Sequence, residues 1–308
     1  MSIPIYYVDA FTDKLFAGNP AAVIFSDLND SKLMQNIAAE NNLSETAFIK
    51  KENSKYLIRW FSPTCEIDLC GHATLASAFV FFNYIDKEAN EFEVESIKNG
   101  TLKVVRGEEF LYLDFPRDNY KPSNNFIGIE EVLGIRPLEL YKGRDDLLAI
   151  FSNESLVKNM NPDFIKLCKF NARGLIVSAP GNSSDFVSRC FFPRSGVNED
   201  PVTGSAHTTL TPYWSNRLNK NILVAKQLSH RGGMLYCENK GDRIIIGGKA
   251  VEYLKGQISI WTYHISISCL PKFLPVKTFR NAFGAFSNPW VIVSLYKILP
   301  SETKEDSS

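Results

Sequence analysis

A short pattern occurs twice in this 308-residue chain and constrains its fold more than any other feature. Residues 70–77 (CGHATLAS) and 200–207 (DPVTGSAH) each follow an aromatic run closed by proline, and each places a glycine before a polar residue and an alanine. The glycines, Gly71 and Gly204, are 133 residues apart (204 − 71). A glycine at the start of a helix leaves backbone N–H groups free to bind an anion. The repeat therefore predicts two similar lobes that hold a small carboxylate between them.

The composition limits the partners that we expect. The chain carries 34 basic and 34 acidic residues, so its net charge gives no electrostatic footprint for nucleic acid or for an anionic membrane. Six cysteines without regular spacing are typical of reduced thiols rather than of a disulfide framework. The N-terminus has no basic region and reaches Asp9 too early for a secretory signal. We therefore expect a cytoplasmic protein with neither a nucleic-acid nor a membrane partner.

Hydrophobic periodicity predicts a chain that mixes strands and helices. The segment 73–84 is apolar on all sides, which indicates a helix buried in the middle of its lobe. Pro212 is expected in the first turns of a later helix, where proline costs least. Helices are expected from residue 31 to the pair Asn41–Asn42 and at residues 73–84, 129–133 and 208–218. Strands are expected at residues 3–10, 21–25, 43–49, 56–61, 91–96, 102–105, 110–115, 146–152, 174–179, 185–192, 233–237 and 243–247.

Proline and polar residues indicate where the lobes divide. Residues 116–125 are polar and flanked by prolines, which is typical of a linker. We expect an N-terminal lobe at residues 1–117 and a C-terminal lobe at residues 118–260. Residues 261–308 carry four prolines and a polar tail, and they have no counterpart in the first half. We expect them to form an extension outside the core.

Five side chains near the repeated pattern are candidates for chemistry. Glu45, at the head of a strand directly after a helix, is either a solvated surface residue or a partly buried carboxylate whose raised pKa lets it pass a proton. His72 and His207 either hydrogen-bond to the neighbouring backbone or take part in a reaction. Asp200 either anchors the turn that follows it or acts in the site. Ser205 is expected to cap the next helix, a role that also permits a hydrogen bond to a ligand.

Cys70 suggests thiol chemistry, which the rest of the pattern opposes. A two-thiol racemase needs a cysteine in both copies, and the second copy has Thr203, whose hydroxyl is far too weak an acid to replace a thiolate. A Cys70–His72 nucleophile is disfavoured because residues two apart on an extended segment are not oriented for proton transfer. The sequence also lacks a histidine pair with metal-ligand spacing, a Gly-x-Gly-x-x-Gly turn and a Walker-type loop. We expect neither a metal nor a nucleotide cofactor.

Several ordered motifs together resemble those of one known family. On these motifs the chain resembles the PhzF (phenazine biosynthesis-like) family, most closely its animal members, over residues 3–260. The resemblance implies an α+β, diaminopimelate-epimerase-like fold of two pseudo-symmetric lobes, each a barrel-like sheet around a central buried helix. The active site is then expected in the cleft between the lobes. The motifs are residues 9–11 (DAF), 16–23 (FAGNPAAV), 43–48 (LSETAF), 69–74 (LCGHAT), 199–207 (EDPVTGSAH) and 229–233 (SHRGG).

The same resemblance implies a cofactor-independent isomerase, without metal, that acts on a small carboxylic acid and forms a homodimer. Glu45 would be the general acid and base that moves a proton between carbons of an unsaturated cyclic acid, assisted by His72 and Asp200. An alternative is a catalytically silent protein that keeps the cleft and acts through protein–protein interaction; a hydrolase that uses Cys70 is a third hypothesis. The residues expected to bind substrate are Ser44, Gly71, Ala73, Gly204 and Ser205.

Overall fold

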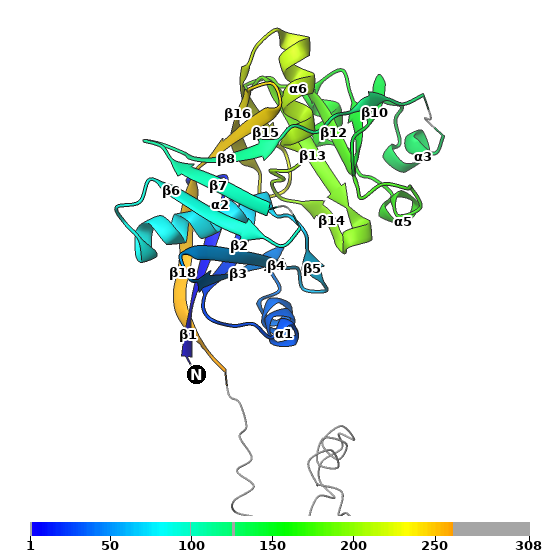
Figure 1. The fold of residues 1–308 in the computed structure, drawn as a ribbon. Helices are drawn as coiled ribbons and strands as arrows, with labels where there is room; N and C mark the ends of the chain where they lie inside the picture. Colours follow the sequence, from blue (N-terminus) through cyan, green and yellow to red (C-terminus); the bar gives the residue numbers. More distant parts are fainter. Residues whose placement is uncertain (1, 99, 125–126, 261–308) are drawn as a thin grey trace, which may run out of the picture. The chain divides into compact units, whose positions relative to one another are not determined.

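The computed structural model describes residues 2–98, 100–124 and 127–260. The predicted extension, residues 261–308, lies outside the described residues. Within the described part, the chain forms an α+β fold in which eighteen paired strands surround two buried helices (Figure 1). No helix among these residues is long and apolar enough to cross a membrane.

The elements follow one another along the chain with short connections. The helices are α1 (Ser31–Asn41), α2 (Gly71–Val80), α3 (Ile129–Leu133), α4 (Glu154–Lys158), α5 (Phe164–Leu167) and α6 (His207–Leu218), with a π-helical turn at Phe81–Ile85 and a 3-10 turn at Pro193–Ser195. The strands are β1 (Ser2–Ala10), β2 (Asn19–Phe25), β3 (Glu45–Glu52), β4 (Lys55–Phe61), β5 (Glu66–Ile67), β6 (Glu91–Ser96), β7 (Gly100–Arg106), β8 (Leu111–Pro116), β9 (Lys121–Pro122), β10 (Glu139–Lys142), β11 (Leu147–Ile150), β12 (Leu175–Pro180), β13 (Phe186–Phe192), β14 (Val197–Asp200), β15 (Ile222–Gln227), β16 (Gly233–Asn239), β17 (Arg243–Gly248) and β18 (Ala250–Ser259).

The pattern of strand pairing repeats in the two halves of the chain. In the first half, β1–β2 is antiparallel, β2–β3 parallel, β3–β4 antiparallel, β4–β6 parallel, and β6–β7 and β7–β8 antiparallel. In the second half, β10, β11, β12, β13, β15, β16 and β17 pair in the same order and with the same directions. The duplicated fold that the two glycine patterns predicted is therefore confirmed.

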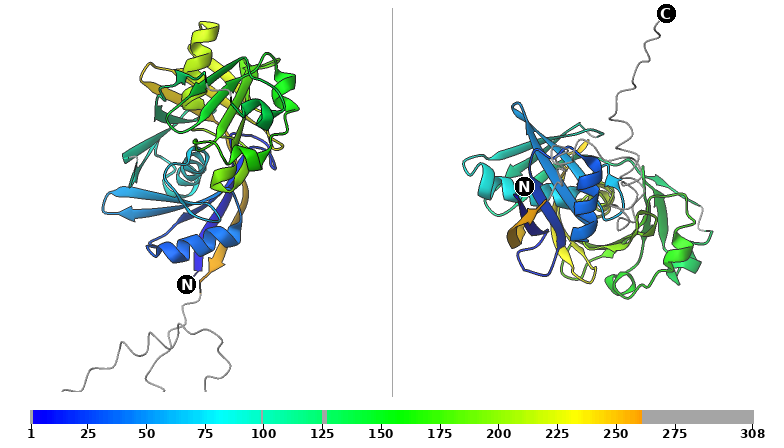
Figure 2. Two further views of the ribbon diagram at one scale, coloured as in Figure 1. Left: turned by 90° about the vertical axis from the view of Figure 1, so that its right-hand side faces the viewer. Right: turned by 90° about the horizontal axis from the view of Figure 1, so that it is seen from below.

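The first lobe is built around α2. All residues of this helix except Phe79 are buried, and the helix contacts β1, β2, β3, β7, β8 and β18. In Figure 2 it lies inside a ring of strands. The prediction of a buried helix is confirmed, but the helix begins at Gly71 instead of residue 73 and passes into a π-helical turn after Val80.

The second lobe is built around α6, which contacts β15, β16 and β17. Trp214 of this helix stacks on Phe186 of β13 with 5.7 Å between ring centroids. Its indole Nε1–H donates to Ser178 Oγ of β12 at 2.9 Å, so the one polar atom of the buried ring is satisfied. These contacts fix the helix against strands on both sides of the lobe.

Pro212 lies inside α6 without breaking it. Because α6 begins at His207, the proline falls in the second turn, within the first turns of the helix as expected. A proline cannot donate to the carbonyl four residues before it, which here is that of Thr208. The backbone N–H of Asp118 donates to this carbonyl instead, at 3.3 Å. The hydrogen bond that proline removes is thus replaced from the chain segment that joins the lobes.

The two lobes exchange strands where they meet. β8 of the first lobe pairs with β17 of the second, and β9, which follows β8, pairs with β10. In the same way β18 follows β17 and returns to pair with β1. Residues 250–259 therefore complete the sheet of the first lobe, although the predicted boundaries place them in the second lobe. The predicted division at residues 117 and 118 stays a prediction.

Several elements lie where none was predicted. The strands β5 and β9 have two residues each, which is too short for any period to show in the sequence. Strand β18 alternates only weakly because much of it is exposed, and it contains a glycine. The other elements without a prediction are β10, β14, β15, α4 and α5.

The core position of α2 can be tested with two leucines. Leu75 of α2 is fully buried, whereas Leu138, which precedes β10, is 62% exposed. We expect Leu75→Ala to lower the free energy of unfolding by about 2–5 kcal/mol, because it deletes buried methyl groups and leaves a cavity. Leu138→Ala is the matched control and should change it by less than about 0.5 kcal/mol. Denaturant unfolding measures both, and equal effects would contradict the burial of α2.

Candidate active site

Glu45 is the first residue of β3, where the chain leaves α1. The helix ends at Asn42, whose left-handed backbone (φ 49°) turns the chain toward the strand. The Glu45 side chain is only 14% exposed, and its Oε2 lies 3.1 Å from Nε2 of His72. Although this is ion-pair distance, Oε2 is buried and has no hydrogen-bond partner among the described residues, because the imidazole N–H is not aligned with it. One carboxylate oxygen of Glu45 thus lies near the imidazole of His72 but accepts no hydrogen bond from the described residues.

His72 is the second residue of α2, and its side chain is 5% exposed. Its Nδ1 lies 3.0 Å from the Asn19 amide Nδ2 and 3.5 Å from Cys70 Sγ, both of which carry hydrogens that Nδ1 can accept. We therefore assign the ring proton to Nε2, which faces Glu45. Burial lowers the pKa of His72, but Cys70 and Glu45 raise it, and the net pKa lies well above its ordinary value. Nε2 therefore carries a proton beside Glu45 whether the ring is neutral or charged.

Asp200 ends β14 and lies on the opposite side of His72 from Glu45's strand. Its Oδ1 accepts from Asn19 Nδ2 at 2.8 Å, and its Oδ2 accepts from Thr203 Oγ1 at 2.5 Å. Burial is the largest influence and raises its pKa to about 6, to which Glu45 also contributes. His72 and the two hydrogen-bond donors act in the opposite direction. Besides Glu45, the site thus holds Asp200, whose carboxyl group changes charge near pH 6.

Asn19, which sequence reasoning did not select, connects these groups. This fully buried residue places Nδ2 within 3.0 Å of His72 Nδ1, 2.8 Å of Asp200 Oδ1 and 2.9 Å of the Val202 carbonyl. Two of these three atoms, the carboxylate and carbonyl oxygens, can only accept a hydrogen bond. The Asn19 side-chain atom that faces them must therefore be the amide nitrogen and not the oxygen. The signal available in the sequence was the Gly-Asn-Pro turn, which was interpreted only as a break before a strand.

The turn that carries Asn19 is held in place by an arginine from the other half of the chain. Arg231 donates from Nε to the Gly18 carbonyl at 2.9 Å, and from one terminal nitrogen to the Ala17 carbonyl at 2.9 Å and to Asp9 Oδ1 at 2.7 Å. Gly18 itself has φ 66°, and a Cβ there would lie 2.2 Å from the Ala10 carbonyl oxygen. Three of the motifs recognised in the sequence therefore meet behind Asn19 and hold it in place.

The second glycine pattern is held by Gln227, another residue that the sequence did not indicate. Its Oε1 accepts from the Thr203 backbone N–H at 2.8 Å, and its Nε2 donates to the Asp200 carbonyl at 2.8 Å. Gln227 is fully buried at the end of β15. It fixes the backbone on which the Asp200 side chain depends.

The two glycines of the repeated pattern lie against each other. A Cβ on Gly71 would be 3.4 Å from the Gly204 Cα, and a Cβ on Gly204 would be 3.5 Å from the Gly71 Cα. Gly71 is the first residue of α2, as expected. Gly204 instead occupies a turn before α6, whose N-cap is Ala206, and no side chain caps that helix. The expectation that Ser205 caps α6 is therefore wrong, because the helix begins one residue later than a Ser205 cap requires.

A cavity of about 120 Å³ collects most of the predicted site residues. Ser44 and Ala73, which were expected to bind substrate, are not among its lining residues; Ala73 is fully buried inside α2. The proposed roles of all these residues stay predictions, but the fold brings together Glu45, His72 and Asp200. The lining residues are Glu45, Ile67, Leu69, Cys70, Gly71, His72, Arg173, Phe192, Ser195, Val197, Asp200, Thr203, Gly204 and Ser205.

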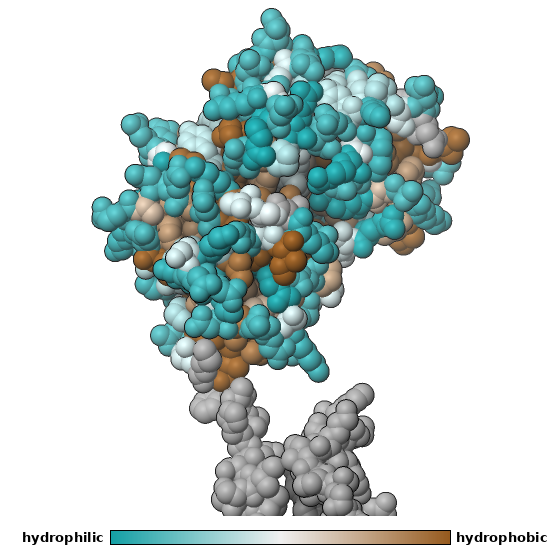
Figure 3. Space-filling model, in the orientation of Figure 1, coloured by the Kyte–Doolittle hydropathy of each residue, from teal (hydrophilic) through white to brown (hydrophobic). Residues whose placement is uncertain are grey.

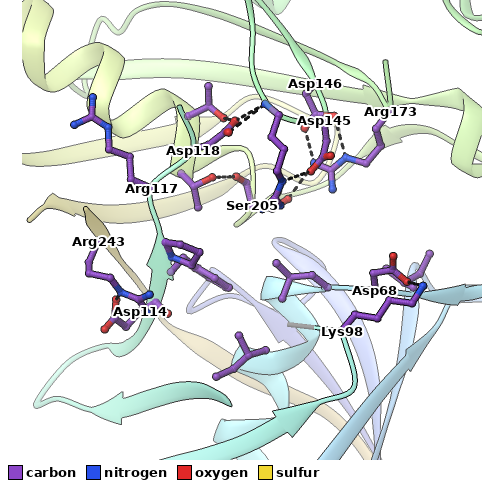
Figure 4. Close-up of a pocket in the computed structure, with 18 of the residues that line it drawn as sticks. Asp68, Lys98, Asp114, Arg117, Asp118, Asp145, Asp146, Arg173, Ser205 and Arg243 are labelled. Carbon is purple, nitrogen blue, oxygen red and sulfur yellow. Dashed lines mark hydrogen bonds and ion pairs between the residues drawn. The ribbon is translucent and has the colours of Figure 1, made fainter. Parts of the chain in front are cut away.

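A larger cavity of about 640 Å³ adjoins this candidate catalytic pocket and shares Ile67, Leu69, Arg173 and Ser205 with it. Figure 4 shows Arg173, Asp146 and Ser205 on one side of it and Lys98 with Asp68 on the other. Hydrophilic residues cover most of the face of the molecule seen in Figure 3. Because the larger cavity contains none of Glu45, His72 and Asp200, we interpret it as the approach to the smaller one.

Arg173 stands where the two cavities join, and sequence reasoning missed it. It forms an ion pair with the buried Asp146, and one of its terminal nitrogens lies 3.4 Å from Ser205 Oγ. Its guanidinium also lies over the ring of Phe192, 5.1 Å from the centroid. The guanidinium is thus fixed in orientation at the mouth of the pocket, with its charge balanced by Asp146.

Cys70 lies closer to His72 than the sequence suggested. Because α2 begins at Gly71, Cys70 is its extended N-cap residue and His72 is already helical, which brings Sγ within 3.5 Å of Nδ1. Burial and the charge of Glu45 nevertheless raise the pKa of Cys70 to about 11, so the thiol keeps its proton. Such a thiol is a poor nucleophile.

One candidate ligand from each of Glu45, Cys70 and His72 lies within 4.8 Å of the other two. The fold thus creates a cluster that could hold a metal ion, which the spacing in the sequence did not indicate. Metal binding would require Cys70 to lose the proton that its surroundings retain.

His207 has a different environment from His72. It is fully buried at the start of α6, where its Nδ1–H donates to the Thr203 carbonyl at 2.8 Å. Burial lowers its pKa to about 4, so the ring is neutral. It lines neither cavity, and its role is to support the turn that carries Gly204.

The raised pKa of Asp200 has a consequence for stability. The folded protein keeps this proton up to about pH 6, whereas the pKa of an unperturbed carboxyl of this kind is 3.8. The group therefore favours folding below about pH 4, and this contribution is lost as the pH rises to about 6. We expect the free energy of unfolding, relative to that of Asp200→Asn, to fall by the order of 1–3 kcal/mol across this window. Asp27→Asn, at an exposed position, is the control; a pH-independent difference for Asp200→Asn would contradict the raised pKa.

Comparison with known proteins agrees with this architecture. The family model described as phenazine biosynthesis-like protein (PhzC-PhzF) matches residues 8–256. An uncharacterized isomerase of Pseudomonas aeruginosa is 46% identical over 262 residues, which cover 84% of this chain and 100% of the relative. Phenazine biosynthesis-like domain-containing protein 2 of Mus musculus is 39% identical over 289 residues, with the same coverage of 84% and 100%. The bacterial relative thus shares more identical positions with this chain than the animal one.

Solved structures show the same fold. The crystal structure of a PhzF family protein from Enterococcus faecalis superimposes with a TM-score of 0.81 at 49% identity, covering 84% of this chain and 100% of that one. A probable proline racemase from Agrobacterium radiobacter, at 8% identity, shares the fold with a TM-score of 0.57, covering 85% and 94% of the two chains. On the family model and these relatives, the chain belongs to the phenazine biosynthesis-like (PhzC–PhzF) family.

Proposed function

We propose that this chain is a cofactor-independent isomerase that acts on a small unsaturated carboxylic acid by proton transfer through Glu45. The observation that carries the proposal is that Glu45 lines the catalytic pocket and that its Oε2 is buried there without a hydrogen-bond partner among the described residues. An uncapped carboxylate oxygen in a low-dielectric pocket is a suitable base toward a carbon acid. The relatives named as uncharacterized isomerases support the reaction class.

In the proposed reaction, Glu45 removes a proton from a carbon of the bound acid. The electron pair of the broken C–H bond moves into the conjugated system, and the double bond shifts. Glu45 then returns the proton to another carbon and regains its charge, so the product is an isomer and no cofactor is consumed. The first backbone N–H groups of α2, beginning at Gly71, have no partner within the helix and are suited to the charge that develops on the substrate.

The duplicated fold supports a mechanism with one base. Thr46 pairs with Phe61 in the first lobe, and Leu175 pairs with Phe191 in the second; each aromatic residue stands two positions before the proline that closes its run. The residue before Leu175, and thus the counterpart of Glu45, is Gly174. A Cβ at Gly174 would lie 2.1 Å from a ring carbon of Phe192, so no side chain fits there. A single base favours moving a proton along one face of the substrate over racemisation by two opposed bases.

Deuterium exchange tests the role of Glu45. The protein is incubated in deuterated water with a panel of unsaturated and amino acids, and incorporation of deuterium is followed by mass spectrometry. We expect Glu45→Gln to lower the exchange rate by about 10²–10⁴-fold, the usual contribution of a general base. Glu52→Gln, at the exposed end of the same strand, should leave the rate unchanged.

Two outcomes of that assay would count against the proposal. Exchange that persists in Glu45→Gln would assign the proton transfer to another group. No exchange by the wild-type protein with any member of a broad panel would favour the alternative, a silent protein that acts through a protein partner.

The protonated thiol of Cys70 gives a second test. Because its pKa lies near 11, we expect Cys70→Ala to change the exchange rate by less than about tenfold. Alkylating reagents should likewise modify this buried cysteine slowly. A loss as large as that of Glu45→Gln would instead support the hypothesis of thiol chemistry.

A further inference from the structure

An open groove of about 520 Å³ lies next to the catalytic pocket and is rich in cations. Four basic side chains line it, and Asp145 is the single acidic residue among its described lining residues. The basic residues are Lys142, Arg144, Arg173 and Arg194, and the remaining lining residues are Asn171, Ala172 and Ser195. The chain as a whole is neutral, so this local excess of positive charge is a property of the groove.

Two of the four cations are neutralised by carboxylates. Arg173 pairs with Asp146, and Arg144 Nε donates to Asp145 Oδ2 at 2.9 Å. The pair of Arg173 and Asp146 is visible at the edge of the large cavity in Figure 4. These pairs orient the side chains but cancel their charge, so they do not account for the excess.

The other two cations bond only to main-chain carbonyls within the described residues. Lys142 Nζ lies 3.3 Å from the Asp145 carbonyl and 3.4 Å from that of Asn171. Arg194 donates from one terminal nitrogen to the carbonyls of Phe170 and Ala172 at 2.9 and 3.3 Å. A carbonyl holds a cation in place without cancelling its charge, since it is a dipole and not an anion.

Donors are left over after these contacts. The Nε and second terminal nitrogen of Arg194 have no hydrogen-bond partner among the described residues, and the two contacts of Lys142 are long. If Lys142 and Arg194 served only to stabilise residues 170–172, their hydrogen bonds to the main-chain carbonyls would be sufficient. Two fixed and uncompensated charges with spare donors are what a doubly charged oxyanion requires.

The groove adjoins the catalytic pocket. Arg173 and Ser195 line both, and Arg173 also lines the large cavity. A ligand whose carboxylate end lies near Glu45 can therefore extend past Arg173 into the groove without leaving the protein surface.

We propose that this groove binds a phosphate-type dianion, and that it receives the phosphorylated end of a carboxylic acid whose other end enters the catalytic pocket. Phosphate monoesters carry a charge of about −1.5 to −2 at neutral pH, which matches the two uncompensated cations. The assignment of the substrate end rests on the proposed function, whereas binding of the dianion itself does not.

Calorimetric titration with inorganic phosphate tests the anion site at constant ionic strength. We expect the double variant Lys142→Gln/Arg194→Gln to bind phosphate at least about tenfold more weakly than the wild type, because it removes two charge-assisted contacts. Lys226→Gln is the control, since Lys226 is a half-buried cation on β15 outside the groove. Thermal unfolding without ligand shows whether each variant is folded. If Lys142→Gln/Arg194→Gln is unfolded, Lys142→Gln alone takes its place.

A series of linear phosphonocarboxylic acids tests the connection to the catalytic pocket. Phosphonoacetate, 3-phosphonopropionate and 4-phosphonobutyrate place the two anionic ends at increasing separations. At least one of them should bind about tenfold more tightly than inorganic phosphate, and this advantage should be lost in the variant.

The results separate the two claims. Equal phosphate affinity in the wild type and the folded variant would overturn the anion site. Phosphate binding that depends on Lys142 and Arg194, without any gain from a second anionic end, would show a free-anion site and overturn the proposed substrate class. Failure of Glu45-dependent deuterium exchange would count against the isomerase function alone, because these binding measurements need no turnover.

Discussion

The whole arrangement of the pocket depends on one buried amide. Asn19 reaches His72 of the first glycine pattern and Asp200 and Val202 of the second, so a single side chain links the two copies. Because Asn19 is fully buried, its hydrogen bonds are stronger than they would be at the surface. The amide also determines which nitrogen of His72 carries the proton. The orientation of the group beside Glu45 is thus a consequence of a residue that does not itself line the cavity.

The duplication supplies symmetry in the backbone but not in the side chains. Both lobes have the same order of strand pairs around a buried helix, and their two glycines touch. The carboxylate that we propose transfers the proton occurs once, because Gly174 stands where the first lobe has Glu45. The thiol also occurs once, and in the second copy Thr203 instead donates a hydrogen bond to Asp200. The two copies of one backbone pattern thus carry different polar side chains.

The fold was predictable from the sequence because its strongest signals are local. A helix apolar all round must be buried, and two similar patterns far apart indicate two similar lobes. Residues such as Asn19, Arg173 and Gln227 gave no such signal, since their partners come from distant positions and only the tertiary fold brings them together. The contact between Cys70 and His72 was misjudged because it depends on the residue at which α2 begins. The roles of the predicted site residues stay predictions, although most of them line one cavity.

The return of β18 to β1 has a consequence for the order in which the protein folds. During synthesis from the N-terminus, the sheet around α2 lacks its last strand until residue 259 has been made. The strands around α6, from β10 to β17, are complete before that point. We therefore expect the strands of the later half to pair during synthesis before the sheet of the earlier half is complete, with the edge of β1 exposed until β18 has been made. The part of the protein that is made first is the part that is finished last.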